Sequence, residues 1–115
     1  MKYRVQIVCG CGFDKNGREI SYYLASDGVT TIRSKAAALF GGSTYWTTDG
    51  NWLNDDGKLV DETGFVLQLD NLDVSRLPEA RQFAATVRDA LNQNSVVFVA
   101  HPVDVEFIQL VKENP

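Results

Sequence analysis

The sequence has few of the residue types that most often carry chemistry. Its 115 residues include one histidine, two cysteines and three prolines, and they contain no run of about 18 apolar residues. Because histidine and cysteine are scarce, zinc binding or thiol catalysis would have to use the single histidine, His101, together with Cys9 and Cys11. The missing apolar run excludes a transmembrane helix, so no membrane partner is expected.

Basic residues are also few, and they do not cluster. Lys and Arg number 11 against 15 Asp and Glu, which gives a formal net charge of -4. Such a charge repels phosphate backbones, so nucleic acid is not expected as a partner. Positions 49–73 hold seven acids and the single base Lys58, a net charge of -6. A solvated hairpin face is favoured for this stretch over attraction of a cation or a basic partner.

The two cysteines, Cys9 and Cys11, are separated by one residue. This spacing strains an intrachain disulfide and differs from the widely spaced framework of small secreted domains. The N-terminal residues pass directly into an alternating segment instead of an apolar signal segment. Reduced thiols and a cytoplasmic location are therefore expected.

The composition is that of one globular domain spanning residues 1–115. Hydrophobic residues make up 44% and aromatic residues 10% of the chain, which argues against disorder. A chain of this length buries roughly two-thirds of the surface that its unfolded form exposes. One core is enough for it to fold unaided.

Several segments have the patterns of β-strands. Apolar residues alternate with polar ones over 3–9 and 65–69, 43–48 is rich in Thr, Tyr and Trp, and 95–100 is a short apolar run. We expect His101-Pro102 to end that last run, and a further edge strand to follow over Val103, Val105 and Phe107. A small hairpin is predicted over 51–60, around Asp55-Asp56-Gly57.

Two segments have the patterns of helices. Val29, Ile32, Ala36 and Leu39 recur at helical spacing, with Ser26 or Asp27 as the expected cap and Gly41-Gly42 as the stop. The second helix follows Ser75 as its expected cap, has Pro78 in its first turn, and buries a stripe that consists of Leu77, Ala80, Ala84, Val87 and Leu91 with Phe83 at its edge.

This order of elements predicts an α+β domain, a ferredoxin-like βαββαβ sandwich with an inserted β-hairpin and an extra C-terminal strand. Two helices can cover only one face of the sheet. The other face must be polar, covered by the hairpin and loops, or buried against another subunit. A homo-oligomer that associates through that face is expected.

A set of short motifs follows the first predicted helix. In order they are Gly42-x-Thr44, Gly50-x-Trp52, Gly57, Glu62 ahead of an apolar strand, and Gln93-x-Ser95-Val96. Together they resemble a group of small bacterial and phage-associated proteins of unknown function that share a ferredoxin-like domain. The resemblance covers roughly Val29 to Phe107 and implies the fold and no established activity. The segment from Cys9 to Gly12 has no counterpart in that group.

The known motifs for metals and nucleotides are weak or missing. Cys9, Cys11 and His101 would supply three zinc ligands if they met, but a fourth ligand is lacking and idle thiols are favoured. Cys11 with His101, and Asp104 nearby in sequence, is a weaker candidate for a nucleophile pair. The acidic hairpin fails the spacing of a calcium loop, and Gly10-Cys11-Gly12 is too short for a phosphate loop. No metal or cofactor is expected.

The remaining candidates are aromatic and polar side chains expected on the open sheet face beside the hairpin, with the single histidine near them. The candidate ligand-binding or partner-binding residues are Tyr45, Trp46, Trp52, Glu62, Gln93 and His101. Aromatic rings with a few fixed polar groups are typical of binding pockets and interfaces. The packed core of a protein uses the same rings, so core packing is the alternative interpretation.

Because no catalytic constellation is recognisable, the favoured function is a non-catalytic interaction or assembly module that acts as a homo-oligomer or binds another protein. The alternative is a small-molecule-binding protein or a cofactor-free enzyme of the dimeric ferredoxin-like kind.

Overall fold

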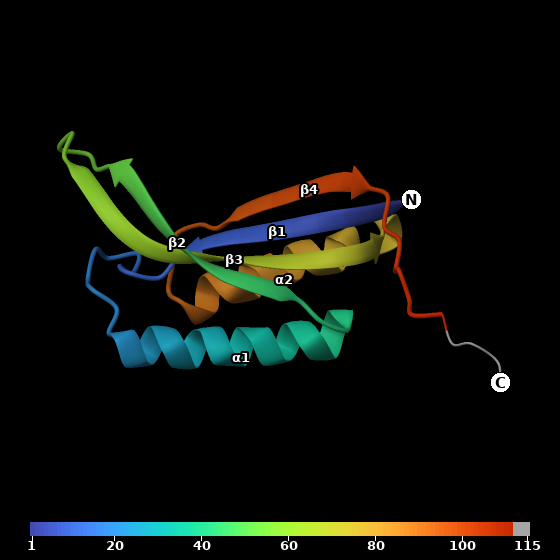
Figure 1. Ribbon diagram of the computed structural model, residues 1–115. Coiled ribbons are helices and arrows are strands. Elements are labelled where there is room, and N and C mark those ends of the chain that lie inside the picture. The colour runs from blue at the N-terminus through green and yellow to red at the C-terminus, as the bar shows by residue number, and fades with distance from the viewer. Residues whose placement is uncertain (112–115) are drawn as a thin grey trace.

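The computed structural model describes residues 1–111 and shows a four-stranded sheet with two long helices (Figure 1). The elements are β1 (Lys2–Gly10), α1 (Tyr22–Phe40), β2 (Thr44–Leu53), β3 (Leu59–Asp73), a short 3-10 turn η1 (Val74–Arg76), α2 (Leu77–Ala90) and β4 (Val97–Val103). The strand order is β2-β3-β1-β4 and every neighbouring pair is antiparallel. This confirms the predicted α+β, ferredoxin-like fold class.

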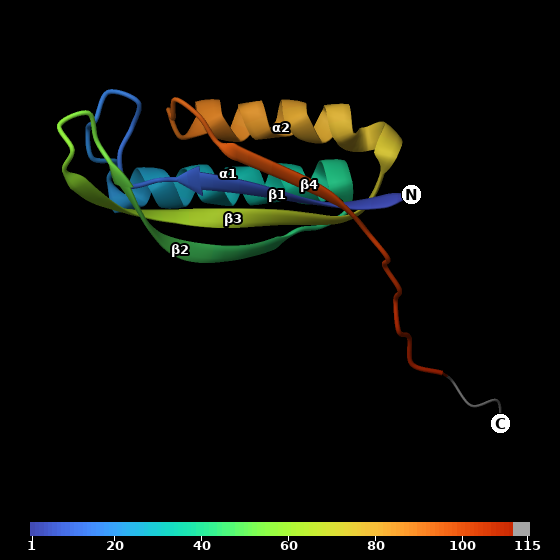
Figure 2. The ribbon, with the colours of Figure 1, turned by 90° about the horizontal axis from the view of Figure 1, so that it is seen from above.

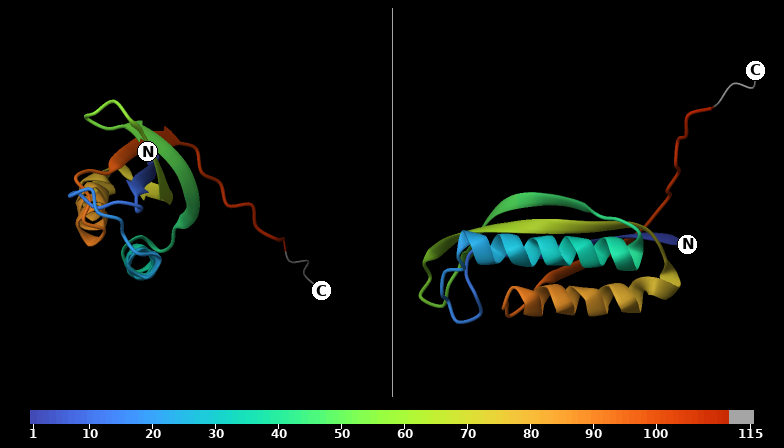
Figure 3. Two further views of the ribbon diagram at one scale, coloured as in Figure 1. Left: turned by 90° about the vertical axis from the view of Figure 1, so that its left-hand side faces the viewer. Right: turned by 90° about the horizontal axis from the view of Figure 1, so that it is seen from below.

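Both helices lie on the same face of the sheet, as the views in Figures 2 and 3 show. In the central strand β1, Ile7 lies opposite Leu67 of β3 and Phe98 of β4. Because side chains alternate across a strand, these residues share the helix-covered face. Their sequence neighbours point to the opposite face, here named the reverse face.

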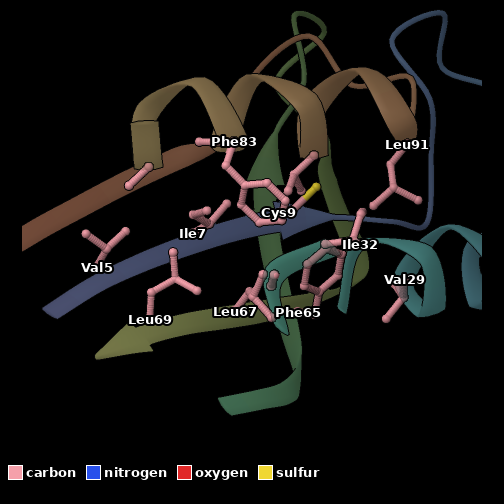
Figure 4. Packing of buried hydrophobic residues seen from close by; sticks show 14 of the residues in the cluster. Val5, Ile7, Cys9, Val29, Ile32, Phe65, Leu67, Leu69, Phe83 and Leu91 are labelled. Carbon is pink, nitrogen blue, oxygen red and sulfur yellow. The ribbon is translucent and has the colours of Figure 1, made fainter. Parts of the chain in front are cut away.

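The core lies between the sheet and the two helices (Figure 4). Val5, Ile7 and Cys9 of β1 are at most 2% exposed, and Phe65, Leu67 and Leu69 of β3 are fully buried beside them. The alternation in the sequence therefore marked the buried face correctly. Each large apolar side chain buried in this way stabilises the fold by about 1.5–3 kcal/mol.

Helix α1 begins earlier than the sequence pattern predicts. Its N-cap is Ser21, whose hydroxyl accepts a hydrogen bond from the backbone N–H of Leu24 at 3.2 Å, and not Ser26 or Asp27. The first turn is exposed, with Tyr22, Tyr23 and Leu24 at 68–80%, so it carries no apolar periodicity. The helix ends as predicted, because Gly41 adopts a left-handed backbone with φ 84°.

The predicted hairpin forms, but it consists of the distal ends of β2 and β3 instead of a separate insertion. Pairing continues to Leu53 opposite Leu59, and the turn between them is closed by a hydrogen bond from the Asn54 N–H to the Lys58 carbonyl at 2.9 Å. The side-chain oxygen of Asn54 also accepts from the N–H groups of Asp56 and Lys58. Figure 1 shows this hairpin curving away from the helices.

Helix α2 buries the predicted stripe, but its entry differs from the prediction. Asp73 caps the preceding turn η1 by accepting from the Ser75 N–H, and Ser75 itself lies inside that turn. Leu77, Ala80, Ala84 and Val87 are buried as expected.

Two predictions about the C-terminal part were wrong. Strand β4 continues through Pro102, which pairs with Tyr3, because an edge strand tolerates a missing N–H on its open side. Val103 ends this strand, and within residues 104–111 no further strand forms, because β1 begins at Lys2 and offers no neighbour beyond it. Within residues 1–111 no helix is long and apolar enough to cross a membrane.

Candidate functional site

An open pocket of about 860 Å³ lies at the end of the sheet where β1 stops and the hairpin curves away. Its floor is formed by Val8 and Gly10 of β1 and Gly64 of β3. Three segments surround this floor: the loop Phe13–Gly17, the hairpin, and the connection Gln93–Val97 between α2 and β4. The volume is within the usual range for small-molecule sites.

Glu62 is the central polar residue of this pocket. It lies on β3 opposite Gly50, and its Oε2 accepts hydrogen bonds from the backbone N–H groups of Gly12 at 3.2 Å and Phe13 at 2.9 Å. Charge-assisted bonds of this kind are about twice as strong as neutral ones, so they fix both the carboxylate and the loop. No donor in residues 1–111 reaches Oε1, which is left accessible to accept a hydrogen bond from a ligand.

Glycine makes room for this carboxylate. A Cβ added to Gly10 would lie 2.6 Å from Oε1 and 2.9 Å from Oε2 of Glu62, and one added to Gly12 would lie 3.1 Å from its Cγ. These distances are shorter than van der Waals contact allows. The two glycines of the Gly10-Cys11-Gly12 segment therefore position Glu62 against the backbone and do not form a phosphate loop.

The loop that forms one wall is held in place by bonds to distant segments. The side-chain Nε2 of Gln93 donates to the Phe13 carbonyl at 2.7 Å, and the Lys15 N–H donates to the Asn92 carbonyl at 2.7 Å. Inside the loop, Asp14 accepts from the N–H groups of Arg18 and Asn16, and these bonds lower the pKa of its carboxyl. The wall is thus fixed before any ligand binds.

The pocket combines rings, amides and a few charges. Trp52, which is 48% exposed, and Phe13 offer aromatic surface. The amides of Asn51 and Asn94 and the ammonium group of Lys15 offer donors. Aromatic surface with a few convergent polar groups suits a flat heterocycle that carries hydroxyl and amino groups.

The thiols beside the pocket are not prepared for nucleophilic attack. Burial, followed by the charges of Cys11 and Glu62, raises the pKa of Cys9 to about 12, and its side chain faces the helices. Burial and the charge of Glu62 also raise the pKa of Cys11. Because the thiolate is the reactive form, neither residue is a strong nucleophile near neutral pH.

The structure brings three of the six candidate residues to the pocket: Trp52, Glu62 and Gln93. Trp46 lies on the reverse face outside the pocket lining. Tyr45 points to the helix side, where it packs against Phe65 and under the guanidinium of Arg33.

His101 lies at the opposite end of the sheet. It pairs with Arg4, five residues along β1 from Cys9, which is about 17 Å at the usual rise of a strand. The zinc set and the thiol–imidazole pair therefore do not form. No group of three metal-ligating side chains is present in residues 1–111.

Sequence reasoning missed Phe13, Lys15, Asn51 and Asn94 as pocket residues. The available signal was the concentration of turn-forming residues over 10–17 and 92–95. Two loops that flank neighbouring strand ends are candidates to meet, but their side-chain contacts depend on the tertiary fold.

Comparisons with known proteins give a structural likeness only. No protein-family model matches the sequence, and no curated protein matches it. A solved phage SAM lyase in complex with S-methyl-5'-thioadenosine has a TM-score of 0.63 and 14% identity, covering 87% of this chain and 80% of that chain. A phage SAM lyase in the apo state has a TM-score of 0.59 and 15% identity, covering 93% and 92%. Identities this low show a shared fold alone.

The likeness contradicts the predicted non-catalytic interaction or assembly module, since both neighbours are enzymes. That prediction depended on the absence of a catalytic motif. A site assembled from single residues of separate segments carries no such motif. The chain therefore has the fold of known enzymes, with a preformed pocket at one end of its sheet.

Proposed function

We propose that the pocket binds S-adenosylmethionine and that the protein is a lyase that releases S-methyl-5'-thioadenosine from it. The observation that carries the proposal is the carboxylate of Glu62, held by two backbone N–H groups with Oε1 left open, beside the ring of Trp52. The likeness to phage SAM lyases supports this substrate class.

The ligand and the pocket match in chemistry. The adenine ring would stack on Trp52, a contact that contributes about 1–3 kcal/mol in proteins that bind bases. The ribose hydroxyls would donate to Oε1 of Glu62, as carboxylates commonly bind ribose. Asn51 and Asn94 offer amides for the ring nitrogens or the amino acid part.

The reaction needs no resident cofactor. The bond between sulfur and the γ-carbon breaks and its electron pair stays on sulfur, which becomes a neutral thioether. As that bond breaks, a carboxylate oxygen of the same substrate forms a bond to the γ-carbon. The four-carbon fragment therefore leaves as a five-membered lactone that keeps its ammonium group, and no water is added. Since the sulfonium charge disappears along this path, a carboxylate held directly against sulfur would favour the substrate over the transition state. Glu62 is therefore assigned to the ribose and not to sulfur.

The test is to incubate the protein with S-adenosylmethionine and to measure S-methyl-5'-thioadenosine by chromatography, with calorimetry for binding of both compounds. Glu62→Gln is expected to weaken binding of both compounds by about tenfold or more, as loss of a charged hydrogen bond does. A loss for S-adenosylmethionine alone would place the carboxylate at the sulfonium instead.

Matched variants separate the site from general effects. Asp61→Asn removes the same charge from the neighbouring exposed position and is expected to leave binding unchanged. Gly10→Ala is expected to displace the Glu62 carboxylate and to lower affinity as Glu62→Gln does, since the clashing atoms are the end of a flexible side chain. The proposal is wrong if neither compound binds the wild type.

We include a cytoplasmic location in this proposal. The substrate class is a small metabolite, and the free thiols of Cys9 and Cys11 suit a reducing compartment.

A further inference from the structure

The reverse face of the sheet is divided into a polar and an apolar part. In the polar part, Arg4 donates to Asp70 at 2.6 Å, Gln68 donates to the other oxygen of Asp70 at 2.9 Å, and Gln6 donates to Gln68 at 2.9 Å. These side chains bond one another across β1 and β3. A face whose polar groups are already paired can be covered without leaving them unsatisfied.

The apolar part lies beside this network and is open. Trp46 of β2 is 39% exposed, and Val97 and Val99 of β4 are 57% and 37% exposed. Val66, which is only 7% exposed, and Val8 lie between Trp46 and Val97 in the register of the sheet. Neither helix covers this side of the sheet (Figure 2). Contiguous apolar surface of this kind on a small domain marks an interaction site.

The same chain also carries an apolar segment with nothing to pack against. The C-terminal tail, defined as Asp104–Val111, has Phe107 at 69%, Ile108 at 85%, Leu110 at 92% and Val111 at 85% exposed. It continues from β4 past the start of β1, so no strand of its own sheet lies beside it. All views show it leaving the body of the molecule (Figures 1–3).

We propose that the tail of one copy docks on the apolar part of the reverse face of a second copy, and that the exchange is reciprocal. Each chain supplies one uncovered apolar segment and one uncovered apolar face, so a two-fold pair satisfies both and makes every contact twice. Asp104 and Glu106 direct the tail away from the hairpin, whose Asp55, Asp56 and Asp61 repel it. The tail therefore lies over Val99, on the part of β4 farther from the hairpin, and reaches Val97 at the rim of the pocket.

The experiment is sedimentation velocity over a concentration series of the full chain. The tail variant carries Phe107→Ser and Leu110→Ser, two exposed positions whose change leaves the core intact. The face variant carries Val99→Lys, a residue that natural edge strands accept. The control is Thr30→Lys, an exposed position of α1.

The wild type and the control are expected to dimerise, and each variant alone to lose about tenfold or more in its association constant, or about 1.4 kcal/mol. A mixture of the tail variant with the face variant keeps one intact tail and one intact face, so it is expected to associate more tightly than either variant alone. A monomeric wild type, a dimer unaffected by the tail variant, or a mixture no better than its components overturns the proposal. Circular dichroism of each variant confirms that it is folded.

Discussion

Gly64 of β3 lies close against the backbone of the neighbouring strand β1. A Cβ there would lie 2.6 Å from the Cys9 carbonyl oxygen and 3.0 Å from Oγ1 of Thr48. Because that carbonyl belongs to the central strand, it cannot move aside as a side chain can. Gly64→Ala is therefore expected to lower the free energy of unfolding by about 1–3 kcal/mol, as overpacking does.

Urea denaturation measures this loss, and Gly50→Ala is its control. A Cβ at Gly50 meets only the Glu62 carbonyl oxygen at 3.8 Å, an ordinary contact, so its stability is expected to stay close to that of the wild type. Equal losses in the two variants would show that close approach is not the reason why position 64 is glycine.

Cys9 gives the protein a stability that depends on pH. Burial raises the pKa of its thiol to about 12 in the folded state, while the unfolded thiol titrates at about 9. The folded state therefore keeps a proton that the unfolded state loses, so this contribution to stability is complete below pH 9 and is lost as pH rises toward 12. At the top of that window the loss is on the order of 4 kcal/mol, since each pKa unit corresponds to about 1.4 kcal/mol.

Urea denaturation between neutral pH and pH 11, on the wild type and on Cys9→Ala, isolates this effect. All other titratable groups are the same in the two proteins, so only the difference between the two curves reports on Cys9. The wild type is expected to lose more stability than the variant above pH 9. Parallel curves would mean that the thiolate is tolerated at this site.

At the scale of elements, α1 begins at a different residue in the structure than the sequence pattern predicts. Ser21 accepts from the Leu24 N–H, whereas Ser26, one of the two caps that the sequence predicts, lies one turn inside the helix and is exposed. Ser21→Ala is expected to destabilise the protein by about 1 kcal/mol, the usual cost of losing a capping side chain. Ser26→Ala is expected to be neutral or slightly stabilising, because alanine is the better helix former. Thermal denaturation of the two variants compares the caps, and the reverse order would place the helix start where the sequence pattern did.

The elements that could be predicted from the sequence are those in which one buried face makes apolar residues recur at a regular spacing. The alternation in β1 and the stripe in α2 follow directly from which side chains face the core, so the βαββαβ order and the two-helix face could be inferred. The first turn of α1 is solvated and carries no period. The end of β4 was misplaced because Pro102 is a strong breaker in general and a weak one on an edge strand.

The site was predictable only in part for a similar reason. Trp52, Glu62 and Gln93 stand out by residue type beside turns. Whether they meet depends on contacts with no local signal, such as the bond between Gln93 and the Phe13 carbonyl across 80 positions of sequence. His101 and Cys9 lie on neighbouring strands, but the register of β1 with β4 separates them.

At the scale of the whole molecule, the pocket is lined by three segments that lie far apart in the sequence: residues 13–17, 51–60 and 93–97. A ligand that contacts all three must slow local opening in each of them. With S-methyl-5'-thioadenosine at one hundred times its dissociation constant, unfolding becomes about 2.7 kcal/mol less favourable for the whole chain. Amides that exchange through local opening of the three segments gain protection only where the ligand bridges them.

Hydrogen exchange with mass spectrometry is therefore expected to show slower exchange in peptides from all three segments and no local change at the C-terminal end of α1, which lies outside the pocket. The comparison is the Glu62→Gln variant at the same ligand concentration. Its protection is expected to fall in all three segments together, because Glu62 fixes the loop through the Gly12 and Phe13 N–H groups. Protection confined to the hairpin would show that the ligand binds Trp52 as an exposed ring. In that case the ligand does not bind across the whole pocket, and the assignment of Glu62 to the ribose is wrong.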